Sequence, residues 1–168
     1  MPTLPTPKTG VFHFRLLRDI AQEDWFSLCR LVTLAHRQLR LKPETTGIEP
    51  IPIICNGAGI TPLRYDDSLI GLGVIVFNGE HHHQLSGDTF ILNQHRHPYD
   101  RGYCHTYGHP YLFMVMAVLL LAHHTSPTAW KITSDVSGSE WQHVADWLLA
   151  ELAIVIALPN GISTGIKP

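Results

Sequence analysis

The sequence predicts an α+β fold in which a largely antiparallel sheet of four to five strands is covered by three helices, in the order β-α-β-β-β-α-β-α. Three observations predict it: a segment with a period of two near the start, two helical segments in the second half, and β-branched runs in the middle. These middle runs are separated by Asn-Gly turn signals and not by helices. Strands connected in that way pair antiparallel.

The first two elements follow from their periodicity. Residues 11–17 ("VFHFRLL") place apolar side chains on one side and His13 and Arg15 on the other, as in a half-buried strand. Residues 22–40 repeat apolar residues at helical spacing, and Pro43 follows the end of the helix. His36 falls on the apolar side of this helix, so we expect a core histidine.

The middle of the chain predicts two or three adjacent strands. The runs are "IPIICNGAG" (51–59), "LIGLGVIVFNG" (69–79) and "TFILNQH" (89–95), and the last two form a predicted hairpin.

The sequence of the second half of the chain predicts a helix, a strand and then a second helix. Residues 110–122 ("PYLFMVMAVLLLA") are apolar on every side, with Pro110 in the first turn. This run spans about 20 Å at 1.5 Å per residue, short of the roughly 30 Å of a bilayer core, so we expect a buried helix and no membrane span. "WKITSD" (130–135) predicts a strand, and Ser139 to Gln142 fit a capping box that opens the last helix.

The expected organisation is a flexible leader at residues 1–10, a single domain at 11–158 and a loose tail at 159–168. The leader "MPTLPTPKTG" has three prolines and lacks the apolar stretch of a secretory signal. The three cysteines are widely spaced and contain no CxxC pair, which is typical of reduced thiols. These features predict a cytoplasmic protein.

The charge content argues against nucleic acid as a partner. The chain has 12 Lys plus Arg, 14 Asp plus Glu and a formal net charge of −2, without a basic run. No Walker loop, GxGxxG, nucleophile elbow or HExxH occurs. The absence of these common motifs favours a binding module over an enzyme.

Nine of the 12 histidines lie between His81 and His124. The triplet at 81–83 precedes the strand at 89–95, whereas His95 and His97 lie at its far end. At about 3.3 Å per residue the strand separates the two groups by roughly 20 Å, so they belong to different sites. We expect the triplet to be a solvated hairpin tip.

The second group lies in "NQHRHPYDRGYCHTYGHPY" (93–111), directly before the buried helix. Free N–H groups and the dipole at a helix start favour anions. Arg101, His105 and His109 are therefore candidate ligand-binding residues. The predicted function is a non-catalytic binding module for a partner protein or a small anionic ligand.

The same segment supports an alternative, a metal-dependent hydrolase with its site in residues 95–109. His95, His97, Cys104 and His109 offer the nitrogen and sulfur ligands that zinc prefers, and Asp100 would act as general base.

Three smaller hypotheses concern single residues. Cys104 is either a nucleophile or a small side chain packed under the loop. Asp66 and Asp67 are either paired carboxylates or turn residues. Trp147 lies off the centre of its helix's apolar stripe and is a candidate partner contact.

Several segments of the chain are similar to an uncharacterised family of small bacterial proteins. The matching segments, "YDDSLI", "FNG", "DTFIL", "YCHTYGHPYLFMVMAVLLLA" and "SDVSGSEW", correspond to the family pattern FNG, ETF, CxTxxxPYD, AVLL and SDG and lie within residues 63–149. The resemblance implies no activity. It implies lysine at the positions of His105 and His109, which suits an anion better than zinc. This chain has Leu112 in place of the family's aspartate, and Val136-Ser137 where the family has glycine.

Overall fold

The computed structural model describes residues 10–64 and 72–162. Its elements confirm the predicted α+β class and order, with three α-helices and five strands in the described residues. They are β1 (Val11–Leu16), α1 (Gln22–Leu41), the 3-10 helix η1 (Pro43–Thr46), β2 (Val74–Phe77), β3 (Phe90–Asn93), β4 (Tyr103–His105), α3 (Leu112–Thr125), β5 (Trp130–Ser134) and α4 (Gly138–Leu152).

The strands form two antiparallel sheets where the sequence predicted one. The larger has the order β4-β1-β5, and the smaller pairs β2 with β3. The two sheets meet at Asp88, two residues before β3: its N–H donates to the carbonyl of His105 in β4 (2.9 Å) and its Oδ2 accepts from the His105 N–H (3.0 Å). This contact consists of one peptide and one side chain and does not extend into a ladder between β3 and β4.

Two segments differ from their predicted conformation. Residues 51–59 form no strand, and only Cys55 makes isolated bridges to Pro62 and Asn78. Pro52 lacks the N–H that a ladder needs. β4 lies inside the segment predicted as a loop, where three residues were too few for a periodic signal. Asp66 and Asp67 lie outside the described residues.

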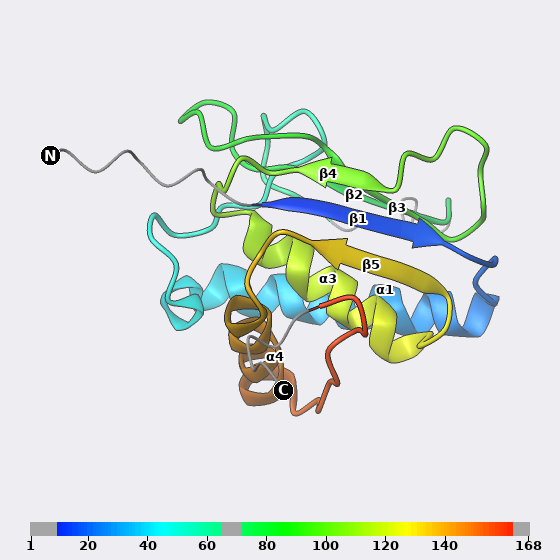
Figure 1. Ribbon diagram of the computed structural model, residues 1–168. Helices are drawn as coiled ribbons and strands as arrows, with labels where there is room; N and C mark the ends of the chain where they lie inside the picture. Colours follow the sequence, from blue (N-terminus) through cyan, green and yellow to red (C-terminus); the bar gives the residue numbers. More distant parts are fainter. Residues whose placement is uncertain (1–9, 65–71, 163–168) are drawn as a thin grey trace, which may run out of the picture.

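The three helices lie together on one side of the sheets (Figure 1). Residues Phe113 to Ala122 of α3 are all buried, as predicted for the apolar run, and α3 packs against both α1 and α4. In β1, Phe12, Phe14 and Leu16 face this core, whereas His13 and Arg15 are exposed. The alternation of β1 therefore defines an inner and an outer sheet face.

Two details of α4 correct the sequence analysis. The N-cap is Ser137, not Ser139, and its side chain accepts from the Glu140 N–H (3.3 Å). The expectation that Trp147 contacts a partner is wrong, because its side chain is buried. Its Nε1 donates to Thr45 Oγ1 (2.8 Å) and its ring packs on Phe113 at 5.2 Å. The apolar stripe of α4 is simply wider than expected.

The core histidine predicted in α1 gives a pH dependence of stability. Burial, with a contribution from the Arg40 charge, lowers the pKa of His36 from 6.5 to about 4. The unfolded chain therefore binds more protons, and stability present above pH 6.5 is lost as the pH falls toward 4. We expect the free energy of unfolding, measured by urea denaturation, to fall by about 2 kcal/mol between pH 7.5 and pH 5. The fall should be smaller in His36→Gln. An equal loss in both proteins would contradict this assignment.

Candidate functional site

The outer face of the β4-β1-β5 sheet gathers positive charge. Arg15 of β1 lies directly opposite Lys131 of β5 in the ladder, and both side chains are exposed. His13, the next outward residue of β1, lies opposite Thr133 on one side and Tyr103 on the other. The His13 and Tyr103 rings are in contact, with centroids 5.0 Å apart.

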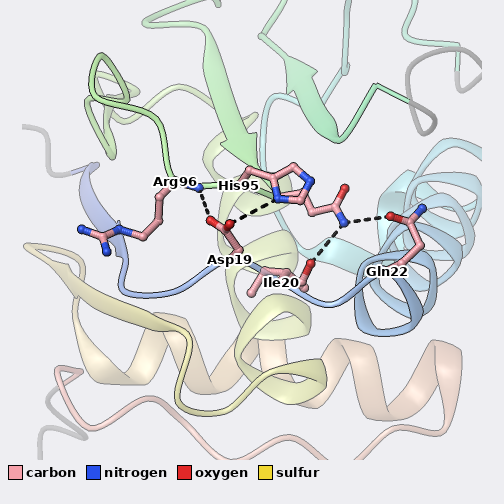
Figure 2. Close-up of polar contacts among 6 residues, drawn as sticks. Asp19, Ile20, Gln22, His95 and Arg96 are labelled. Carbon is pink, nitrogen blue, oxygen red and sulfur yellow. Dashed lines mark hydrogen bonds and ion pairs between the residues drawn. The ribbon is translucent and has the colours of Figure 1, made fainter.

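The segment after β3 adds further cations to this face. Asp19, which follows β1, accepts from the Arg96 N–H (2.7 Å) and lies 3.7 Å from Nδ1 of His95. Figure 2 shows these contacts, with the Arg96 side chain directed away from Asp19 and the His95 ring. Next to them, Gln94 Nε2 donates to the Ile20 carbonyl (3.1 Å). These bonds fix the segment against the end of β1.

A tight turn then returns the chain to the sheet. Gly102 has φ +55°, and a Cβ there would lie 2.8 Å from the Phe14 carbonyl oxygen, so only glycine fits. Its carbonyl accepts from the Phe14 N–H (2.8 Å). Arg101 is thereby held beside β1, with its guanidinium carbon 5.8 Å from the centroid of the Tyr103 ring.

The outward residues of β1 and β5 and the segment 96–102 line a pocket of about 730 Å³, which we call the cationic pocket. It contains four cations and one carboxylate, Asp100, giving 4 − 1 = +3 with neutral histidines. Among the described residues, none of the four cations forms an ion pair with a carboxylate. The lining residues are His13, Arg15, Leu16, Arg96, His97, Pro98, Asp100, Arg101, Gly102, Lys131 and Thr133.

The structure brings only Arg101 of the three predicted anion-binding residues into this pocket. His105 stacks on Tyr107 (centroids 3.8 Å apart), and His109 lines a different pocket beside α3 and α4. The start of α3 also offers few free donors. The N–H groups of Leu112, Phe113 and Met114 donate to the carbonyls of residues 109–111 at 3.0, 3.1 and 3.0 Å. The helix start therefore lacks the donors on which the sequence hypothesis depended.

The four predicted zinc ligands have separate surroundings. His95 lies beside Asp19, Nδ1 of His97 accepts from the Tyr99 N–H (3.1 Å), Cys104 is fully buried, and His109 lines the pocket near α4. No group of three or more His, Cys, Asp or Glu that could hold a metal ion occurs in residues 10–64 and 72–162. The geometry of the described chain gives no support to the hydrolase hypothesis.

The triplet His81 to His83 lies in an exposed turn of the β2–β3 connection, as expected. Its contacts are local: His83 Nδ1 lies 2.9 Å from a Glu80 oxygen, and His81 Nδ1 lies 3.2 Å from Ser86 Oγ.

Sequence reasoning missed most of the cationic pocket. The alternation in "VFHFRLL" marked Arg15 as an outward residue, whereas "WKITSD" gave only a strand and did not single out Lys131. The sequence could not predict that β1 pairs with β5, because their residues lie more than one hundred positions apart. Nor could it predict the register that sets Arg15 beside Lys131.

Comparison of the sequence with protein-family models, curated proteins and solved structures found no match. The family resemblance stays a prediction. None of the described helices combines the length and the apolar character needed to cross a membrane.

The environment of Cys104 makes it a poor nucleophile. Burial is the main cause that raises its pKa to about 12, and its Sγ donates to the Asp88 carbonyl (3.5 Å). Cys29 and Cys55 are also buried, and burial raises the pKa of each thiol.

We therefore expect no thiol to react with an aromatic disulfide reagent within minutes at pH 8 in the native protein, because thiolate and access are both lacking. All three should react after unfolding in guanidinium. Rapid native labelling that disappears in Cys104→Ser would contradict this expectation and restore the nucleophile hypothesis.

Proposed function

We propose that the protein is a binding module for a small ligand that carries several negative charges, held in the cationic pocket. The observation that carries the proposal is the direct cross-strand pairing of Arg15 with Lys131. Arg101 and Arg96 add to this pair from the segment that closes the pocket.

Like charges directly opposite on a sheet destabilise it by roughly 0.2–1 kcal/mol. A bound anion offsets that repulsion, because each cation then also has a neighbour of opposite charge. Phosphate groups suit the site well, since guanidinium groups bind their oxygens with two parallel hydrogen bonds. A ligand with two or more phosphates could contact both the sheet pair and the loop cations.

The charge distribution favours a small ligand over a long polyanion. The chain carries −2 in total and the pocket +3, so the remainder carries −2 − 3 = −5. A nucleic acid strand that continued beyond the pocket would meet this negative remainder. The pocket volume of about 730 Å³ lies in the range usual for small-molecule sites.

The lining supports binding more than catalysis. Asp100 is the one carboxylate among the described residues that line the pocket, and its Oδ1 already accepts from the Gly102 N–H (3.1 Å). Catalysis by paired carboxylates would need a second such group.

The test is calorimetric titration with tripolyphosphate. In the double variant Arg15→Gln/Lys131→Gln we expect the Kd to rise about 100-fold, because each charged hydrogen bond contributes about 1.5–3 kcal/mol. Binding by the natural chain should also weaken steeply with added salt.

The control variant is Arg30→Gln/Arg37→Gln, which removes the same charge from exposed positions of α1, away from the pocket. Its Kd should stay within about twofold of the natural chain. Equal weakening in both double variants would mean that only net charge matters, and absence of binding by the natural chain would reject the function.

A further inference from the structure

We infer that the ligand is a nucleotide with two or more phosphates, whose base lies in a second pocket that adjoins the cationic pocket. This inference rests on the proposed function, because the phosphates occupy the cationic pocket. It adds the base, which the charges of the cationic pocket alone do not specify.

The second pocket, which we call the aromatic pocket, has a volume of about 520 Å³. It shares His97, Asp100, Arg101 and Gly102 with the cationic pocket, so one ligand can extend across this common wall. Its other wall is formed by Ile91 and Asn93 on the outward face of β3 and by Thr89 directly before that strand. The two pockets thus adjoin at residues 97–102, with the cations on one side and a less polar lining on the other.

The aromatic pocket exposes side chains that usually avoid water. Tyr99 is 84% exposed and Ile91 is 43% exposed, and both line the same pocket. Tyr103 lines the same pocket, with the Arg101 guanidinium over its ring. A planar base stacked on these groups would cover apolar surface while its phosphates remain beside the cations.

A polar group is also available for the edge of a base. In the part of the chain that the structure describes, the Asn93 side-chain amide has no hydrogen-bond partner, whereas Thr89 Oγ1 already donates to the Gly57 carbonyl (2.7 Å). An amide both donates and accepts, which is the pairing that base edges offer. Sugar phosphates and inorganic polyphosphates would leave Tyr99, Ile91 and Asn93 unused.

The experiment compares pyrophosphate with the four common ribonucleoside diphosphates by calorimetric titration of the full chain. We expect at least one nucleoside diphosphate to bind about tenfold or more tightly than pyrophosphate, because a stacked base strengthens binding by that order. In Tyr99→Ala the advantage over pyrophosphate should disappear, while pyrophosphate binding stays unchanged. The matched control is Tyr107→Ala, which removes a tyrosine that is 49% exposed and lines neither pocket, and should preserve the advantage.

The outcomes separate the two proposals. If pyrophosphate binds and no nucleoside diphosphate binds more tightly, the inference fails and the proposed function stands. If neither binds, or if binding persists in Arg15→Gln/Lys131→Gln, the proposed function fails as well. A ten-residue single-stranded oligonucleotide that binds more tightly than every nucleoside diphosphate would overturn the small-ligand inference in favour of a nucleic acid.

Discussion

The pairing of β1 with β4 on one side and β5 on the other is the constraint on which the rest of the structure depends. It directs Phe12, Phe14 and Leu16 to the core covered by the helices. The same alternation places Arg15 beside Lys131 and His13 beside Tyr103 on the outer face. A shift of one residue in either ladder would exchange these two sets, so core and site are fixed together.

The fold was largely predictable because its signals are local. The alternation of β1, the helical spacing of α1 and the fully apolar α3 each define an element from a short stretch of sequence. The separation into two sheets was not predictable, since it depends on which distant strands pair: β1 with β4 and β5, and β2 with β3. The three residues of β4 are likewise stabilised by β1 and not by their own periodicity.

The candidate site was predictable only in part. The segment 93–111 that the sequence singled out contains Arg101, which lines the cationic pocket, but the structure separates Cys104 and His109 from His97. The cations that matter most in the proposal, Arg15 and Lys131, belong to strands far apart in the sequence, β1 and β5. No local pattern brings them together, because ladder partners are chosen by the packing of the whole core.

The central claim is that the repulsion between Arg15 and Lys131 on the outer face lowers the stability of the protein without ligand. The most direct measurement is the free energy of unfolding, in low salt and without anions, of Lys131→Glu against the matched charge change Arg30→Glu on α1. We expect Lys131→Glu to raise the unfolding free energy by about 0.2–1 kcal/mol, because repulsion with Arg15 becomes attraction, while Arg30→Glu gives no gain. A decrease in Lys131→Glu equal to or larger than that of Arg30→Glu would contradict the account.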